Sequence, residues 1–367
     1  TGRTRFAGDY TMPSMLHGRV LRSELASARL KHLDASAARS LPGVSCVLTA
    51  EELPDRLAAT DMPGQTGQKR ASTDRQILVR EFIRHHGEPL ALIAAETPAI
   101  AEKAHDLIEC EIEPLPGVYD IDAALGRDAP IVTEPDNIVG QHKIRKGNVE
   151  KGFAEADHII ENTFKTQFIE HAFLEPEVGL AWVDENGVIN IRMSTQVIEH
   201  FRFIADALGV PHNKVRILGA MVGGGFGGKE DFPDMIAAHA ALLALRVGQS
   251  VKIIYDRHED IIATTKRHPG RIVHRTGVAA DGRLIAMDIE VVLDGGAYVT
   301  LSPVVLSRAV LHAAGAYRCP NVRIQGKVLA TNTAPNGAFR GFGAPQSIFA
   351  VERHMDAVAR KVGLDPY

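Results

Sequence analysis

Eight consecutive residues, Gly223 to Glu230, form the most distinctive segment of this sequence. The segment reads Gly-Gly-Gly-Phe-Gly-Gly-Lys-Glu and contains five glycines. Because glycine has no side chain, the backbone N–H groups of such a loop can come close to a ligand. The loop follows a strand-like stretch, 215–222, and opens a helical pattern. Free N–H groups at a helix start favour a phosphate or another oxygen-rich anionic group.

Three interpretations compete for this loop. Gly223, Gly225 and Gly228 match the G-x-G-x-x-G fingerprint of dinucleotide-binding folds, but the acidic residue Asp256 comes later than that fold requires. Residues 223–229 also match the start of a P-loop, but Glu230 replaces the Ser or Thr whose hydroxyl would bind Mg²⁺. The third interpretation is a glycine-rich turn that only permits tight packing.

The elements expected around the loop describe an α+β chain. Short alternating strands at 44–49 and 90–95, with an Ala-rich helix at 98–107, predict a small domain over residues 1–125. A proline-rich segment with little periodicity, 126–150, is the expected linker. A larger domain, 151–367, carries predicted helices at 197–208, 232–245 and 348–362. The second of these is rich in Ala and Leu, which predicts a core helix.

Composition excludes several classes of function. The net charge is −4 and no Lys/Arg block is present, which gives no electrostatic footprint for nucleic acid or anionic lipid. No apolar run reaches the roughly 18 residues of a membrane span, and no signal peptide is expected. Cys46, Cys110 and Cys319 are far apart and show no CxxC pair, so we expect neither a disulfide framework nor a zinc site. A cytoplasmic protein is expected.

Three motifs in order resemble a known family. The glycine segment, with Ser194-Thr195-Gln196 before it and Ala338-Phe339-Arg340-Gly341-Phe342-Gly343 after it, is similar to the molybdopterin-binding large subunit of the xanthine dehydrogenase and aldehyde oxidase family. The resemblance extends to 3–22, 171–176 and 267–269, and it covers essentially the whole chain. It implies an a/b hammerhead domain over 1–125, followed by the first molybdenum-cofactor-binding domain of the N-terminal part of such a subunit.

The resemblance implies a molybdopterin-type molybdenum cofactor, whose plain or cytosine-dinucleotide form stays open. The metal is held by the pterin dithiolene, so no side chain of the protein is a direct ligand. Gln196 matches the glutamine whose amide contacts the apical oxo group. Gly225, Phe226, Gly227 and Arg340 match positions that approach the molybdenum and the pterin.

The resemblance also implies a substrate class. Glu230 matches the position that separates purine hydroxylases from aldehyde oxidases, Arg308 matches the substrate arginine, and Phe342 matches the ring that packs against the heterocycle. Purine-type hydroxylation of xanthine or hypoxanthine, with water-derived oxygen, is therefore expected. Nicotinate or another N-heterocycle, or an aldehyde, remains an alternative. Glu230 alone also fits a helix-start carboxylate, and Arg308 a structural ion pair.

No catalytic base is expected in this chain. In the family, the base is a glutamate of a Gly-Glu motif in the second cofactor domain, which implies a partner chain or a missing C-terminal half. Gly87-Glu88 imitates that motif, but Glu88 is expected to be structural. Glu170 and Glu175 are expected to be ordinary polar or ion-paired residues. Electrons would pass to iron–sulfur clusters and FAD in partner subunits.

Two hypotheses from other classes compete with this one. A Rossmann-type nucleotide-binding protein would hold a nicotinamide cofactor in place of molybdenum and pterin. A non-catalytic scaffold subunit would keep the fold but would have lost the cofactor. The presence of Gln196, Phe226 and Arg340 argues against the scaffold.

Overall fold

The computed structural model describes residues 2–53, 60–62, 71–73, 75–133 and 135–366, which form two compact units. Unit 1 comprises residues 1–117, 170–265 and 332–335, and unit 2 comprises 118–169, 266–331 and 336–367. Both mix helices and sheets, and the predicted α+β class is confirmed. Each unit gathers stretches that are far apart in sequence. The sequential division at 125 and 150 stays a prediction.

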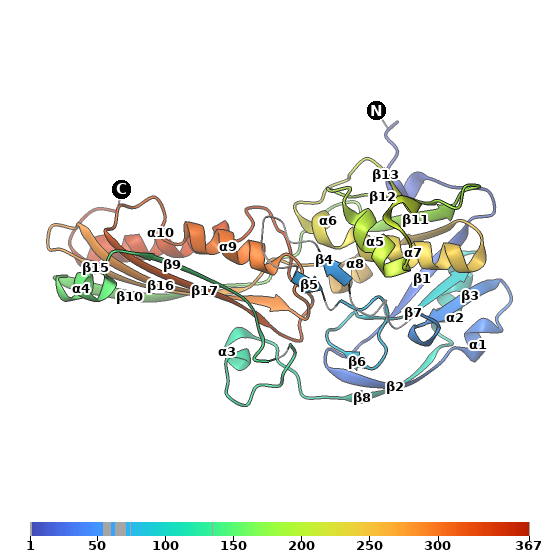
Figure 1. Ribbon diagram of the computed structural model, residues 1–367, viewed down its shortest axis with the longest axis horizontal. Coiled ribbons are helices and arrows are strands. Elements are labelled where there is room, and N and C mark those ends of the chain that lie inside the picture. Colours follow the sequence, from blue (N-terminus) through green and yellow to red (C-terminus); the bar gives the residue numbers. More distant parts are fainter. Residues whose placement is uncertain (1, 54–59, 63–70, 74, 134, 367) are drawn as a thin grey trace. The chain divides into compact units, whose positions relative to one another are not determined.

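A seven-stranded sheet forms the centre of unit 1 (Figure 1). Its first strand, β1, pairs in parallel with β14, with Leu16 opposite Val251. The sheet therefore joins strands from the beginning of the chain with strands that flank the glycine loop. In spatial order the strands are β13 (Val215–Gly219), β12 (Ile189–Met193), β11 (Val178–Val183), β14 (Val251–Ile254), β1 (Leu16–Arg22), β7 (Pro89–Ala95) and β3 (Val44–Thr49).

Helix α7 (Pro233–Val247) is the core helix of unit 1 and begins just after the glycine loop. Every residue from Pro233 to Ala244 is buried, because Ala and Leu occupy all sides of the helix. Gly179 of β11 allows a close approach, since a Cβ there would lie 3.2 Å from the Ile236 carbonyl oxygen. The predicted core helix at 232–245 is confirmed. A second helix, α5 (His200–Leu208), packs against α7 and ends at Gly209.

The remaining elements of unit 1 are short. A three-stranded sheet has the order β6-β2-β8, and β4 pairs with β5. Thr97 caps α2 by accepting a hydrogen bond from the Ile100 backbone N–H at 3.2 Å. The bounds are η1 (Ala7–Asp9), β2 (Ala28–Asp34), α1 (Ser36–Arg39), η2 (Ala50–Glu52), β4 (Thr60–Met62), β5 (Ala71–Thr73), β6 (Phe82–Ile83), α2 (Pro98–His105), β8 (Glu109–Pro114), η4 (His212–Lys214), α6 (Gly228–Asp231) and α8 (Arg257–Ala263).

Unit 2 is built on a five-stranded sheet with the order β10-β15-β16-β17-β9. Half-buried and exposed residues alternate along β10, and buried and half-buried residues alternate along most of β15, as expected when only one face meets the core. Helices α9 and α10 cover that face (Figure 1). The bounds are α3 (Ile121–Ala124), β9 (Ile138–Lys146), α4 (Val149–Ala154), β10 (His158–Thr166), β15 (Gly270–Val278), β16 (Leu284–Gly296), α9 (Ser302–His312), β17 (Asn321–Ala330) and α10 (Ala344–Lys361).

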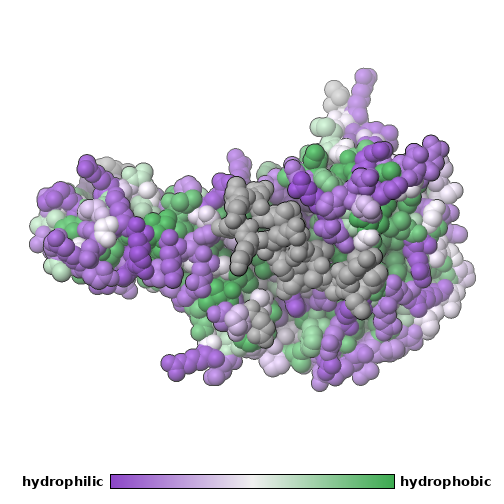
Figure 2. Space-filling view, in the orientation of Figure 1, coloured by the Kyte–Doolittle hydropathy of each residue, from purple (hydrophilic) through white to green (hydrophobic). Residues whose placement is uncertain are grey.

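The opposite face of the five-stranded sheet is polar. Alternate residues of its strands, among them Arg271, Arg275, Asp288, Glu290 and Lys327, form ion pairs there. On the side seen in Figure 2, hydrophilic side chains cover much of the surface of this unit. Strand β9, at one edge of the sheet, lies inside the segment expected to be a linker. In the described residues, no helix combines the length and the apolar character needed to cross a membrane.

Candidate active site

The glycine loop of unit 1 has a backbone that few residue types tolerate. Gly224 and Gly227 have φ of +102°, and Phe226, which lies between them, has φ of +53°. A non-glycine residue in this region is strained, and such strain is concentrated at functional sites. The Phe226 ring is half exposed. Within the described residues, no protein group accepts a hydrogen bond from the backbone N–H groups of Gly225 and Phe226.

Gln196 closes the loop from the side of β12. Its Oε1 accepts hydrogen bonds from the N–H groups of Gly227, at 2.9 Å, and of Lys229, at 3.3 Å. Because the amide oxygen is occupied in this way, the orientation of the amide is fixed. Its Nε2 donates to Glu230 Oε1 at 3.3 Å, and its second N–H is left for another acceptor. A Cβ at Gly225 would lie 2.4 Å from Gln196 Oε1, so a larger residue there would displace the Gln196 amide.

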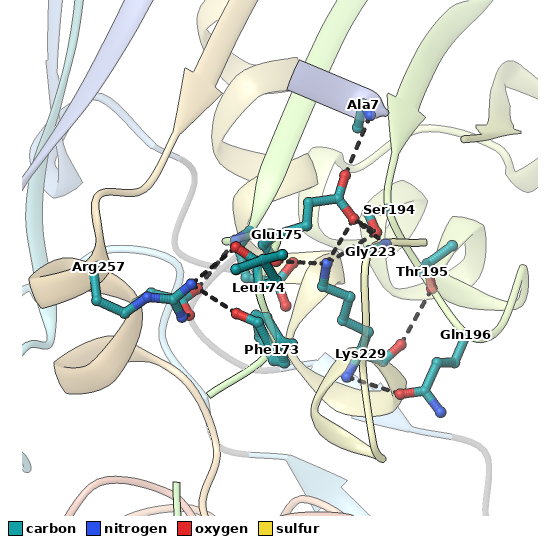
Figure 3. A network of polar contacts seen from close by, with 12 residues as sticks. Ala7, Phe173, Leu174, Glu175, Ser194, Thr195, Gln196, Gly223, Lys229 and Arg257 are labelled. Carbon is teal, nitrogen blue, oxygen red and sulfur yellow. Dashed lines mark hydrogen bonds and ion pairs between the residues drawn. The ribbon is translucent and has the colours of Figure 1, made fainter. Parts of the chain in front are cut away.

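A buried ion pair holds the glycine loop in place (Figure 3). Lys229 is completely buried, and its Nζ donates to Glu175 Oε2 at 3.0 Å, to the Glu175 carbonyl oxygen at 2.9 Å and to Ser194 Oγ at 3.0 Å. Glu175 Oε2 also accepts from Ser194 Oγ and from the Gly223 N–H, both at 2.7 Å. The expectation that Glu175 is ion-paired is confirmed. We call these three side chains, Glu175, Ser194 and Lys229, the loop anchor.

Sequence reasoning assigned no role to Lys229 or Ser194. Both belong to the motifs named above: Lys229 directly precedes Glu230, and Ser194 lies two residues before Gln196. The available signal was the position of Lys229 directly after an apolar, glycine-rich segment. A lysine that is buried in such a segment needs a buried hydrogen-bond acceptor. The partner, Glu175, is 54 residues away in the chain, and only the fold brings it close.

A second buried carboxyl, Glu177, lies next to the loop anchor. Burial raises the pKa of Glu177 well above its usual range, and the nearby Lys229 ammonium only partly opposes this effect. Its backbone N–H donates to Asp260 Oδ1 at 3.0 Å, while both of its carboxyl oxygens are buried without a hydrogen-bond partner. Burial therefore favours the neutral form of the Glu177 carboxyl. The oxygen that contacts Lys229 Nζ belongs to Glu175.

Unit 2 contains a second Gly-Phe-Gly loop, directly before α10. Phe342 has φ of +53° and Gly343 has φ of +94°, close to the values at Phe226 and Gly227. The Phe342 N–H donates to the Phe339 carbonyl oxygen at 2.7 Å. Gly343 rests on α9, where a Cβ would lie 2.2 Å from the Val305 carbonyl oxygen. Each unit thus presents a strained phenylalanine at the start of a helix.

Arg308 and Phe342 are brought together in unit 2. The Arg308 guanidinium carbon lies 5.2 Å from the centre of the Phe342 ring, within the range of a cation–π contact. Arg340 precedes the same loop, and its carbonyl oxygen accepts from Arg267 Nη2 at 2.8 Å. The predicted residues therefore form two groups. Gln196, Gly225, Phe226, Gly227 and Glu230 gather in unit 1, and Arg308, Arg340 and Phe342 gather in unit 2.

Other residues considered at the sequence level are structural. Glu88 is buried, and its carboxylate accepts from the Arg84 N–H at 2.6 Å. Cys319 is buried, and its thiol donates to the Asn321 carbonyl oxygen at 3.3 Å. His268 is buried and bonds Ser302 Oγ at 2.7 Å. Burial holds the pKa of His268 at about 3, so this imidazole is neutral.

The glycine loop of unit 1 has the chemistry to bind an oxygen-rich ligand. A Cβ at Gly225 would meet the Gln196 side chain, and a Cβ at Gly343 would meet the Val305 carbonyl oxygen. Each loop backbone therefore packs closely against its neighbour in the same unit. The N–H groups of Gly225 and Phe226 and one N–H of Gln196 are neutral donors for oxo or phosphate oxygens. Neutral donors can hold a metal–oxo group without competing for the metal itself.

Comparison with models of protein families shows which family this chain belongs to. A model described as "Molybdopterin cofactor-binding domain" matches residues 131–367, and one described as "Aldehyde oxidase and xanthine dehydrogenase, a/b hammerhead domain" matches residues 1–116. The chain belongs to the aldehyde oxidase and xanthine dehydrogenase family. The predicted hammerhead domain and cofactor-binding domain are both confirmed.

Individual members of this family are similar over the whole chain. The nicotinate dehydrogenase large molybdopterin subunit of Eubacterium barkeri is 37% identical over 366 residues, which cover 100% of this chain and 84% of that protein. The xanthine dehydrogenase molybdenum-binding subunit of Escherichia coli is 36% identical over 371 residues, which cover 100% of this chain and 49% of that protein. Both relatives are named as dehydrogenases of this molybdenum-dependent family.

A solved structure agrees with the fold. The aldehyde oxidoreductase of Desulfovibrio gigas superposes with a TM-score of 0.91 at 29% identity, and the match covers 100% of this chain and 41% of that chain. The chain thus spans less than half of the solved aldehyde oxidoreductase and about half of the xanthine dehydrogenase protein. Its length is closer to that of the nicotinate dehydrogenase protein.

Proposed function

We propose that this chain holds the molybdenum cofactor and the substrate in a molybdenum hydroxylase that inserts water-derived oxygen into a purine-type heterocycle, xanthine or hypoxanthine. The observation that carries the proposal is the contact of Gln196 Nε2 with Glu230 Oε1 at 3.3 Å. This contact sets the Gln196 amide, which follows β12, beside the Glu230 carboxylate at the end of the glycine loop. When bound, the cofactor supplies the oxygen transfer and the two-electron redox chemistry.

The side chains of this chain bind and orient the substrate in this proposal. Glu230 accepts a hydrogen bond from a ring N–H of the purine. Arg308 stabilises the negative charge that develops on a purine oxygen. Phe342 packs against the plane of the substrate ring, and the Arg308 guanidinium lies over the Phe342 ring. Gln196, Gly225, Phe226, Gly227 and Arg340 hold the cofactor itself.

The proton-accepting base of the reaction belongs, in this proposal, to another polypeptide or to further chain beyond this one. The carboxylates near the glycine loop argue for this. Glu175 is occupied by Lys229, Ser194 and Gly223, and Glu177 is buried. We further propose iron–sulfur and FAD partner subunits, a cytoplasmic location and a cofactor in either the plain or the cytosine-dinucleotide form. The sequential domain division 1–125, 126–150 and 151–367 also remains a proposal.

Nicotinate is the second candidate substrate, favoured by the similarity to the nicotinate dehydrogenase protein. Arg308 would then pair with the substrate carboxylate. The two candidates differ at Glu230. A purine offers ring N–H groups to this carboxylate, whereas the pyridine ring of nicotinate has none.

Replacing Glu230 by Gln distinguishes the two substrates. The amide oxygen of the Glu230→Gln variant can still accept from Gln196, so the loop is preserved, but the charged acceptor is lost. We expect kcat/KM of the purified complex for xanthine to fall by roughly ten-fold or more, while kcat/KM for nicotinate changes little. The matched control is Glu185→Gln, in an exposed turn of the same unit. A wild-type complex that contains molybdenum but oxidises only nicotinate or an aldehyde would overturn the purine assignment.

A further inference from the structure

The glycine loop rests on a short stretch of chain, residues 173–177, which we call the supporting segment. The Phe173 ring is buried, and a Cβ at Gly228 would lie 2.9 Å from Phe173 Cε1, so the ring packs closely against the loop backbone. Glu175 binds the loop through its carboxylate, and its backbone N–H donates to the Gly223 carbonyl oxygen at 3.1 Å. The position of the glycine loop therefore depends on the position of the supporting segment.

The supporting segment is not held by regular secondary structure. It lies between strands β10 and β11, outside every helix and strand of that region. It directly follows Ala172, which has φ of +49°, a strained value for a residue with a side chain. Leu174 has 90% of its surface exposed, so burial of this side chain does not hold the backbone in place. Polar contacts must therefore hold the segment.

Arg257 and Asp260 supply these contacts (Figure 3). Arg257 Nη2 donates to the Phe173 carbonyl oxygen at 2.7 Å and to the Leu174 carbonyl oxygen at 3.1 Å. Its Nη1 donates to Asp260 Oδ2 at 3.0 Å. The other carboxylate oxygen, Asp260 Oδ1, accepts from the Glu177 N–H at 3.0 Å. One Arg–Asp pair thus holds both ends of the supporting segment.

Helix α8, which carries this pair, is itself attached to the central sheet of unit 1. Asp256 caps the helix by accepting from the Glu259 N–H at 2.7 Å. The Glu259 carboxylate forms an ion pair with Arg22 of β1 at 2.8 Å. Arg257 is the first residue of α8, so its guanidinium extends from a fixed base.

We propose that Arg257 is a positioning residue of the cofactor site. Its two η nitrogens join Asp260 to the carbonyl oxygens of the supporting segment, and the planar guanidinium suits such a bridge. The segment, held in this way, keeps the glycine loop in the conformation that receives the cofactor. The inference deepens the proposed function and rests on it.

The first test measures amide hydrogen exchange in the complex expressed in a host that makes no cofactor. The Arg257→Lys variant keeps a cation opposite Asp260, but its single nitrogen cannot occupy the positions of both η nitrogens. We expect the amides of residues 173–177 and 223–228 to exchange roughly ten-fold faster than in the wild type, as for the loss of a charge-assisted hydrogen bond. The strands of the central sheet should keep their protection.

The matched control is Arg353→Lys. Arg353 also forms an i,i+3 pair at 3.0 Å, with Asp356, and within the described residues it donates to no backbone carbonyl. This control should leave the exchange of both segments unchanged. Wild-type exchange of both segments in Arg257→Lys would overturn the inference.

The melting temperature separates positioning from a general structural role. Arg257→Lys should keep a melting temperature close to that of the wild type, because Asp260 retains a counter-ion. Arg257→Met removes that counter-ion from a completely buried carboxylate, so it should both melt earlier and exchange faster at the same two segments. If Arg257→Lys instead speeds exchange evenly throughout unit 1, the arginine has a structural role only and the inference fails.

The second test uses the complex loaded with cofactor. Arg257→Lys should bind roughly ten-fold less molybdenum at limiting cofactor, and its Mo(V) electron paramagnetic resonance signal should shift, because displaced loop N–H donors change the surroundings of the metal. Arg353→Lys should match the wild type in both measurements. Wild-type content and signal in Arg257→Lys would show that the segment does not position the cofactor.

The two tests distinguish this inference from the proposed function. If the wild-type complex contains no molybdenum, the proposed function fails, and the exchange measurements still report whether Arg257 positions the loop. If the wild type contains molybdenum and Arg257→Lys matches it in exchange, content and signal, the proposed function stands and this inference fails.

Discussion

The Lys229 ammonium group lies 3.0 Å from Glu175 Oε2, and the lysine side chain has no exposed surface. The same carboxylate oxygen accepts the Gly223 N–H, at the opposite end of the glycine loop. One buried ion pair therefore fastens both ends of the segment Gly223–Glu230. The loop keeps its strained backbone because these contacts, and those of Gln196, outweigh the strain.

Replacing Lys229 by Met should destabilise unit 1 strongly. The substitution leaves Glu175 buried without its counter-ion, and we expect the free energy of unfolding to fall by about 3–5 kcal/mol. Urea unfolding of the purified chain measures this. Lys151→Met is the control, because that side chain is 72% exposed and its i,i+4 pair with Glu155 contributes little. A loss as small as that of the control would show that the anchor does not stabilise the fold.

A methyl group at Gly225 should damage the cofactor site more than the fold. The Cβ of a Gly225→Ala variant would lie 2.4 Å from Gln196 Oε1, so the amide must move. Since a displacement of about 1 Å can cost roughly 100-fold in rate, we expect a loss of that order in kcat, together with a lower molybdenum content. Gly219→Ala is the matched control, because a Cβ there meets nothing within 4 Å. Normal activity of Gly225→Ala would contradict the assigned role of Gln196.

Asp294 should make the stability of unit 2 depend on pH. Burial raises the pKa of Asp294 from 3.8 to about 6, although the Gly296 N–H and the Thr331 hydroxyl donate to its carboxylate. The folded chain therefore holds this proton more tightly than the unfolded chain. The resulting stabilisation is complete below the ordinary pKa and is lost as the pH rises through about 6.

The Asp294→Asn variant lacks this titration but keeps an oxygen acceptor for both donors. Measured by thermal or urea unfolding, the difference in stability between wild type and Asp294→Asn should shift by roughly 3 kcal/mol in favour of the variant as the pH rises from about 3.5 to 7. Parallel stability curves for the two proteins would show that this carboxyl group titrates normally.

Arg308→Met should affect purines more than aldehydes. The variant removes the guanidinium next to Phe342 that we assign to the developing charge on a purine oxygen. We expect kcat for xanthine to fall by roughly 100-fold, and kcat for an aldehyde to fall much less, because a simple aldehyde lacks the exocyclic purine oxygen that Arg308 would contact. Arg318→Met, at an exposed position, serves as the control. Equal losses for both substrates would remove the specificity argument.

Local sequence patterns predicted the elements that pack by their own periodicity. The predicted strand at 44–49 has the bounds of β3, and the predicted helices at 232–245 and 348–362 correspond to α7 and α10. The helix predicted from 197 begins at His200 instead. The cause is local, because Thr195 Oγ1 accepts from the Val197 N–H and holds that stretch in a turn.

Motif spacing predicted the two Gly-Phe-Gly loops and the residues next to them, because a ligand that binds through backbone groups needs glycines in sequence. The close grouping of Gln196 with Gly227 and Glu230 follows from the structure, as does that of Arg308 with Phe342. Nothing in the sequence indicated that Lys229 pairs with Glu175, because the two residues are 54 positions apart. Their importance depends on burial, which is a property of the fold.

The sequence by itself determined the family, the positions of the two loops and the helices and strands next to these loops. All of these features depend on residue types within a short stretch of chain. Only the tertiary structure decided which distant stretches share a sheet or an ion pair. Leu16 pairs with Val251, and the two compact units interleave segments from the whole chain. Such contacts join residues that are far apart in the sequence. The packing of the whole core determines these strand pairs and ion pairs, so they leave no local pattern in the sequence.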